Sequence, residues 1–445
     1  MSKQFRLLTC PDDIFLLILE RCEQTSLHNL SLTSRSLRPR CIPQLYREVD
    51  LSSHNLGRLP EFEDELRPEI YANTDDFWRP HNLVSRQRSF LRTMTECPEY
   101  ATAVRVFSWT LIWREVNEDA LAEMDYQLWA TFSRLTNVTR LDLASLRRDE
   151  ILDPYIRQIP PLLFPHVTEL RLTGWMHHSL VANILNSIDV AKLQSLSLDA
   201  LQEEGQVPDG SPMPEEINKD CWNSAWRLTS IDHGTIDTTR IKVGIIFPGP
   251  MWSTIAPLVG KLESLQHLEI RIPPLETSGM DTDCTEHLHY IFVLAGLVAS
   301  VVSSLKSLAI DYARDIQRTP STCGTGRNYE LALHLYRSRL SLMILNAFWP
   351  CFSTEREWKW ESLQSVSLRG FLQGNETAAA FEHTTAIKAL QMKIEDSLSS
   401  RGVALEWSND SPRPAVLFMG YDFTISEEAM SQFVRLSQQP QLALT

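Results

Sequence analysis

The chain has 445 residues, a formal net charge of −14 and 43% hydrophobic residues. This length exceeds one ordinary compact core, so we expect two domains or one elongated architecture. The composition is typical of a folded protein. The negative charge argues against non-specific binding to nucleic acid, which requires lysine and arginine clustered on one face.

The first residues, MSKQFRLLTC, lack the long apolar core and the cleavage site of a signal peptide. The strongest apolar stretch, Ile291–Val302, is too short to cross a bilayer, so we expect a buried helix and no membrane contact. The 8 cysteines include no CxxC pair, which favours a reducing compartment. We therefore expect a cytoplasmic or nuclear protein.

The first predicted helix begins at the proline of CPDDIFLLILERC. Proline at the start of a helix loses no hydrogen bond, and the two aspartates after it suit the helix dipole. Ile14, Leu17 and Ile18 form an apolar stripe at helical spacing. Phe15 and Leu19 widen this stripe around most of the circumference.

Two further short helices are predicted before residue 47, one from Thr25 or Ser26 and one that Pro39 and Pro43 are expected to break into turns. The alternation in EVDL, residues 48–51, then predicts a strand. Three short helices cannot bury this many apolar side chains alone. Either the following domain or a partner protein must cover them.

The stretch from Cys10 to Leu51 resembles an F-box of the fungal type. Three pieces carry the resemblance: the P-D-D-I opening, the LxxLSLTSRSLR middle and the PQLYREVDL end. Cys10 stands where the family usually has leucine. The resemblance covers this N-terminal stretch only.

An F-box implies a partner, the Skp-type adaptor, and through it the cullin and RING subunits of an SCF (Skp–cullin–F-box) ubiquitin ligase. The family binds the adaptor with the loop at the proline and with the apolar faces of its helices. By position, the implied adaptor-binding residues are Pro11, Ile14, Leu17, Ile18, Leu30, Leu45 and Tyr46. The alternative is that these residues are only the core of the small helical unit.

Residues 52–100 are predicted to form a connector with an acidic stretch and a helix, and residues 101–445 to form a repeat domain with a C-terminal cap. Segments with an LxL-like strand core recur along this domain, with helical patterns between them. The strand segments are 103–111, 138–146, 167–175, 193–201, 228–236, 265–273, 305–313 and 363–371. Residues 404–407 and 416–425 are predicted to add strands of the cap.

Alternating strands and helices predict an α/β fold that is similar to an irregular leucine-rich-repeat solenoid behind the small three-helix unit. A doubly wound α/β domain is the competing fold. In a solenoid, residues that alternate with the buried LxL positions line the concave face, where a target protein could bind. These candidate target-binding residues are Arg140, Asp142, Glu169, Arg171, His267, Glu269, Arg271, Asp311 and Arg369. The alternative is an ordinary solvated sheet face.

The motifs of catalysis and of nucleotide binding are missing from the sequence, so we expect neither an enzyme nor a cofactor. The segment DTDCTEHLH, residues 281–289, holds possible zinc donors, but its spacing matches no standard site and favours a polar loop before a helix. His177 and His178 likewise suggest a polar loop. No metal is expected.

The sequence therefore predicts a substrate-recognition subunit of an SCF-type ligase in the ubiquitin-conjugation pathway. The adaptor would bind the F-box and an unidentified target protein would bind the repeats. The alternative is an interaction scaffold in which F-box-like helices pack against their own repeats without a ligase role.

Overall fold

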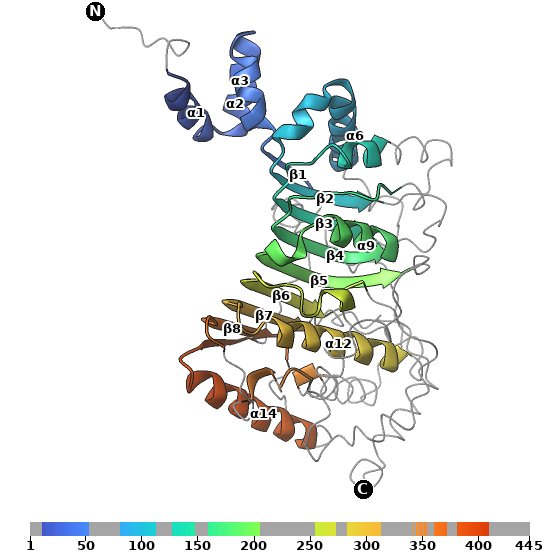
Figure 1. Ribbon diagram of the computed structural model, residues 1–445, viewed down its shortest axis with the longest axis vertical. Helices are drawn as coiled ribbons and strands as arrows, with labels where there is room; N and C mark the ends of the chain where they lie inside the picture. Colours follow the sequence, from blue (N-terminus) through green and yellow to red (C-terminus); the bar gives the residue numbers. More distant parts are fainter. Residues whose placement is uncertain are drawn as a thin grey trace, which may run out of the picture. The chain divides into compact units, whose positions relative to one another are not determined.

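A computed structural model describes residues 11–52, 81–112, 127–146, 159–204, 254–272, 283–312, 360–371 and 381–408, and parts of 341–353. Within these ranges the fold is mixed α/β with nine strands (Figure 1). The chain divides into two compact units, one of Met1–Leu170 with Ser179–Asp189 and one of Arg171–His178 with Val190–Thr445. The predicted domain boundaries at residues 51 and 100 remain predictions.

The first unit begins with three helices and a strand: α1 (Asp12–Glu20), α2 (Gln24–Thr33), α3 (Arg38–Leu45) and β1 (Glu48–Leu51). The prediction that prolines break the third helix is wrong, because α3 is continuous across Pro43. Pro39 lies in the first turn, where its missing N–H costs nothing, and the helix ends two residues after Pro43. The predicted strand at residues 48–51 is confirmed.

A small core holds the three helices together. Its buried residues are Phe15, Leu19, Leu27, Leu37 and Cys41. The guanidinium of Arg40 lies 5.3 Å from the centre of the Phe15 ring, where the ring face attracts a cation. Burial raises the pKa of the Cys41 thiol above its ordinary value, so this thiol stays protonated and packs as an apolar group.

The rest of the first unit contains α6 (His81–Glu96), η4 (Pro98–Ala103), β2 (Val106–Ile112) and β3 (Arg140–Leu146). β1, β2 and β3 are parallel neighbours in chain order. Aromatic side chains fill the space beside these strands, with Phe107 stacked on Trp109 and edge-on to Phe132. The buried amide of Gln87 on α6 donates to the carbonyls of Leu51 and Thr110, which fixes the helix to the ends of β1 and β2.

The second unit contains most of β4 (Glu169–His177) and the strands β5 (Ser195–Glu204), β6 (His267–Ile272), β7 (Ser307–Tyr312), β8 (Ser365–Arg369) and β9 (Ala404–Ser408). Its helices are η5 (Val190–Lys192), η6 (Ala256–Leu258), α12 (Asp283–Ser300) and α14 (Phe381–Ser399), while α9 (His178–Ser187) falls almost wholly in the first unit.

From β5 to β9 each strand pairs in parallel with the next strand along the chain. A doubly wound sheet reverses its strand order at a switch point, and the described strands of the second unit pair without such a reversal. The doubly wound alternative is therefore wrong for this unit.

The strands also begin in the same way. The backbone carbonyl of Gln194 accepts hydrogen bonds from the backbone N–H groups of Gln266 and His267. In the same way, the backbone carbonyl of Gln266 accepts from the backbone N–H groups of Lys306 and Ser307. In the first unit, the backbone carbonyl of Arg105 accepts from the N–H groups of Thr139 and Arg140 in the same arrangement. The LxL side chains of every described segment are buried, as predicted. The described strands therefore share one pattern of hydrogen bonds at their starts and one pattern of buried side chains.

Most predicted elements lie within the described ranges and are confirmed, including strands in all the predicted repeat segments except 228–236, which falls outside them. The acidic stretch of the connector and the predicted strand at 416–425 also fall outside. The apolar stretch Ile291–Val302 is largely a buried helix, as predicted. In the part of the chain that can be described, we find no helix that is long and apolar enough to span a membrane.

Gly370, at the end of β8, should be essential for stability. Its φ is +76°, and a Cβ atom there would lie 2.0 Å from the backbone oxygen of Tyr312. We expect Gly370→Ala to lower the free energy of unfolding by about 2–4 kcal/mol, because both the dihedral angle and the clash penalise a side chain. Urea denaturation measures this change.

Gly402 provides the matched control. Its φ is +71°, but an added Cβ would have no neighbour within 4 Å. Gly402→Ala should cost only about 1 kcal/mol, the penalty of the left-handed conformation. Equal losses in the two variants would show that the contact with Tyr312 does not matter.

Candidate functional site

Most of the predicted binding residues belong to two places: the N-terminal helices and the polar face of the strands in the second unit. On α1, Phe15 and Leu19 point into the small core, whereas Ile14 is 51% exposed and Leu17 is 62% exposed. The helix is apolar around most of its circumference, so a core on one side leaves the neighbouring stripe in water.

The seven predicted adaptor-binding residues therefore divide into two groups. Pro11, Ile14 and Leu17 are exposed. Ile18, Leu30, Leu45 and Tyr46 are half-buried, and Leu30 and Leu45 pack against the helical core. The prediction did not include Leu16 on α1 and Leu32 on α2, which are 44% and 71% exposed.

The helical core is connected to the strands of the first unit at its C-terminal end. Tyr46 stacks on Tyr100, with ring centres 5.4 Å apart, and burial raises the pKa of the Tyr46 hydroxyl above its ordinary value. Gln24 donates to the carbonyl of Glu48 at 3.2 Å. Half-buried Tyr46 thus supports the position of the helices within the unit, whereas the exposed residues of α1 are left on the surface.

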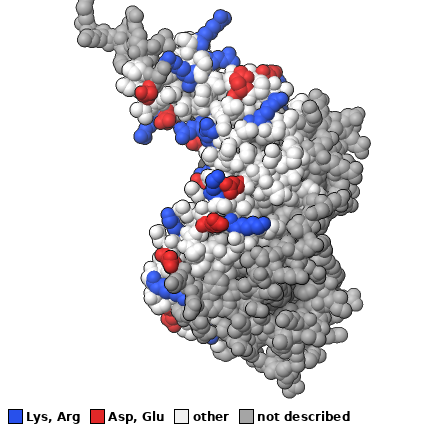
Figure 2. All heavy atoms as spheres, in the orientation of Figure 1, with Lys and Arg blue, Asp and Glu red and all other residues white. Residues whose placement is uncertain are grey.

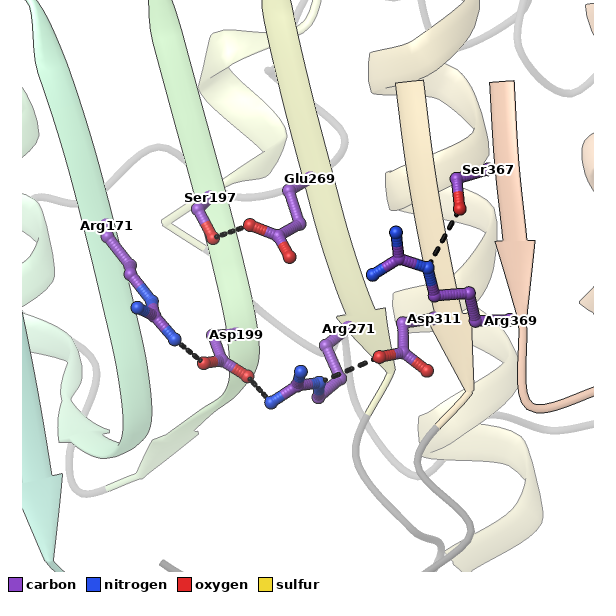
Figure 3. Close-up of polar contacts among 8 residues, drawn as sticks. All are labelled: Arg171, Ser197, Asp199, Glu269, Arg271, Asp311, Ser367 and Arg369. Carbon is purple, nitrogen blue, oxygen red and sulfur yellow. Dashed lines mark hydrogen bonds and ion pairs between the residues drawn. The ribbon is translucent and has the colours of Figure 1, made fainter. Parts of the chain in front are cut away.

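On the polar face of the second unit, one set of side chains from successive strands forms a line, which we name the charge row. Its members alternate in sign: Arg171, Asp199, Arg271, Asp311 and Arg369 (Figure 3). Asp199, Arg271 and Asp311 are register partners on β5, β6 and β7. Parallel pairing in this register therefore places each described acid of the row beside an arginine.

The centre of the charge row is a buried ion-pair network. Arg271 donates to Asp199 at 2.7 Å and to Asp311 at 3.1 Å, and the side chains of these three residues are only 3–7% exposed. Arg171 pairs with the other oxygen of Asp199. Charged groups at this depth are stable only when paired, because each has lost its water.

A second line on the same face, which we name the glutamate row, lies closer to the strand starts. It contains Ser197, Glu269, Ala309, Ser367 and Glu406. Ser197 donates to Glu269 at 3.0 Å, and Ser367 donates to Glu406 at 3.2 Å. Arg369 donates to Ser367 and approaches Glu406 at 3.4 Å, so it connects the two rows.

The structure thus brings together five of the nine predicted target-binding residues: Arg171, Glu269, Arg271, Asp311 and Arg369. Exposed His267 lies beside them and hydrogen-bonds Ser307 at 2.8 Å. The expectation that all nine line an accessible face is wrong for Arg271 and Asp311, which are buried in the network.

The remaining predicted residues belong to the first unit. Arg140 and Glu169 form an exposed ion pair at 3.7 Å, and Asp142 is half-buried.

Sequence reasoning missed Asp199, Ser197 and Glu406. The signal was present in the repeats, because aligning LSLD, LEIR, LAID and VSLR by their buried positions places Asp199 beside Arg271, Asp311 and Arg369. The alternation of sign in that column would have predicted the ion pairs.

The two neighbouring histidines are not in a polar loop, contrary to the prediction. β4 ends at His177 and α9 begins at His178, and both rings are buried. Nδ1 of His178 lies 3.9 Å from the carboxylate of Glu203, which accepts a hydrogen bond from the N–H of Thr254.

Metal-binding clusters of three or more donors are absent from the described part of the chain. The prediction of a polar loop before a helix is wrong for most of DTDCTEHLH, because α12 already begins at Asp283. Its side chains lie outside the described residues, so the absence of a metal there stays a prediction.

No protein-family model matches the chain, and no curated protein is significantly similar to it.

Arg271 should be the most sensitive residue of the charge row. We expect Arg271→Met to destabilise the protein by about 3–5 kcal/mol, because it leaves two buried carboxylates without their shared cation. Arg140→Met is the control, since its ion pair with Glu169 is exposed and should contribute less than about 1 kcal/mol. Urea denaturation of both variants tests this difference, and similar midpoints would contradict the structural role of Arg271.

Proposed function

We propose that this chain is a substrate-recognition subunit of an SCF-type ubiquitin ligase. The helices α1–α3, as an F-box, bind a Skp-type adaptor, which connects the chain to cullin and RING subunits. The strands and helices that follow, as an irregular leucine-rich-repeat-like solenoid, bind a target protein. The chain is not itself the catalyst: it raises the local concentration of the target near a ubiquitin-charged enzyme.

The exposed apolar side chains of α1 and α2 are the observation that carries this proposal. Ile14, Leu17 and Leu32 are more than half exposed, although their helices already have a complete small core. Burying one such side chain on a partner gains about 1.5–3 kcal/mol, so several together supply a substantial part of a binding energy. These residues therefore suit a protein partner better than solvent.

The scaffold alternative requires the F-box-like helices to cover their apolar surface with the chain's own repeats. Tyr46 stacks on Tyr100, which belongs to the predicted connector and not to the repeats, so one contact attaches the helices to the chain that follows them. However, the described residues leave Ile14 and Leu17 exposed, so the contact does not replace a partner. The ligase hypothesis accounts both for the contact of Tyr46 with Tyr100 and for the exposed apolar side chains of α1.

Binding to the adaptor should depend on the exposed stripe of α1. We expect the double variant Ile14→Asp, Leu17→Asp to bind a purified Skp-type adaptor at least about tenfold more weakly, because it places two carboxylates in an apolar interface. Both side chains are exposed, so the fold should be unchanged, as circular dichroism can verify. Co-purification and calorimetric titration give the affinity.

Met392→Asp is the matched control, since Met392 is an exposed apolar residue on α14 in the second unit. It should bind the adaptor like the wild type. If wild-type protein does not bind the adaptor, or if the α1 double variant binds as tightly as the control, the ligase assignment is wrong and the scaffold reading takes its place.

A further inference from the structure

Two cysteines belong to the small helical core of the first unit. Cys41 on α3 is one of its fully buried residues. Cys22 follows the end of α1 by two residues, is half-buried and packs against the same core. Both are free thiols. The other two described cysteines, Cys97 and Cys351, lie outside this core, so Cys22 and Cys41 are the pair that its packing brings together.

The two thiols are close enough to influence each other. Burial raises the pKa of the Cys41 thiol, and the charge of Cys22 raises it further. The second effect requires proximity, because salt screens a charge beyond about 8–10 Å. The backbone N–H of Cys22 donates to the carbonyl of Leu19, and that of Cys41 donates to the carbonyl of Leu37. Each cysteine is thus held one helical turn from a buried leucine of the same core.

The two thiols differ in their access to water. Cys41 is 0% exposed, whereas Cys22 is half-buried and its chain neighbours Arg21 and Glu23 are exposed. At the top of Figure 2, charged side chains of both signs reach the surface of the N-terminal helices, so this part of the unit faces water. A small polar oxidant therefore reaches Cys22 first, and Cys41 is the thiol that reacts with it from inside the core.

We propose that Cys22 and Cys41 form a redox-sensitive thiol pair that controls adaptor binding by the N-terminal helices. The control of binding rests on the proposed ligase function, whereas the thiol chemistry is a property of the chain alone. In a reducing compartment, a disulfide of this kind is transient and acts as a sensor, not as a permanent structural link.

Hydrogen peroxide is the oxidant in this scheme. The Cys22 thiol attacks one peroxide oxygen, which forms a sulfenic acid on Cys22 and releases the other oxygen as water. The sulfur of Cys41 then attacks the sulfur of Cys22, and the sulfenic oxygen leaves as a second water with the Cys41 proton. Two thiols are thereby oxidised to one disulfide, and one peroxide is reduced to two waters. A thiol reductant reverses the bond by exchange.

The disulfide would change the position of α1. A sulfur–sulfur bond is about 2.05 Å long, which is closer than two unbonded thiols approach. Phe15 and Leu19 already close the core, so the bond must draw the end of α1 toward α3. Leu17 and Ile18, within the last turns before Cys22, then shift relative to α2. The adaptor surface that α1 and α2 share would lose its fit.

The test treats the full-length chain with hydrogen peroxide, blocks the remaining thiols with N-ethylmaleimide and maps cross-linked peptides by mass spectrometry. A peptide that joins Cys22 to Cys41 is expected, and dithiothreitol should remove it. Cys97→Ser is the matched control, since Cys97 is also half-buried but lies outside the helical core, and it should cross-link like the wild type. A link from Cys22 to Cys10 or Cys97 in place of Cys41, or no link at all, would overturn the proposal.

Adaptor binding is measured on the same samples after catalase has removed the peroxide. The oxidised wild type should bind a purified Skp-type adaptor at least about fivefold more weakly than the reduced protein. Cys22→Ser, which changes a half-buried residue, should bind equally well before and after the same treatment. Equal affinities of the oxidised and reduced wild type would overturn the control of binding.

The result is separable from the ligase assignment, because the cross-link is detected on the isolated chain. A reduced wild type that does not bind the adaptor would overturn the ligase role and the control of binding together. A Cys22–Cys41 link in that protein would still establish the thiol pair.

Discussion

In-register parallel pairing of β5 to β9 is the constraint on which the second unit depends. It places equivalent positions of successive strands side by side, so that Asp199, Arg271 and Asp311 meet as neighbours. Buried charges tolerate no error in this arrangement, because a shift of one residue would turn the charged side chains to the opposite face. The ion pairs thus favour one register among the alternatives that leucine-rich strands could adopt.

The same constraint creates two kinds of position on one sheet face. Asp199, Arg271 and Asp311 are buried in mutual ion pairs, whereas Glu269, two positions before Arg271, is only half-buried. The division explains why a face of mixed charge need not be a uniform binding surface. At the N-terminus the separation follows helix geometry instead: Phe15 and Leu19 form the core, and Ile14 and Leu17 on the adjacent stripe remain outside it.

Much of this organisation could be predicted from the sequence. The LxL periodicity located the strands, since alternation of buried residues is a property of local pattern, and it identified the face on which Arg171, Glu269 and Arg369 lie. Burial of Arg271 and Asp311 could not be predicted from either residue alone, because it depends on Asp199 from another strand. Which apolar residues of α1 are buried and which are exposed could likewise be seen only in the structure. A helix apolar nearly all round does not reveal which side meets α2 and α3.

Hydrogen exchange of the full-length chain, with and without a Skp-type adaptor, tests the division of functions most directly. The account predicts that adaptor slows exchange in residues 11–33, which include the exposed stripe of α1, and leaves β5 to β9 unchanged. Protection centred on β5 to β9, or no protection in either region, would contradict it.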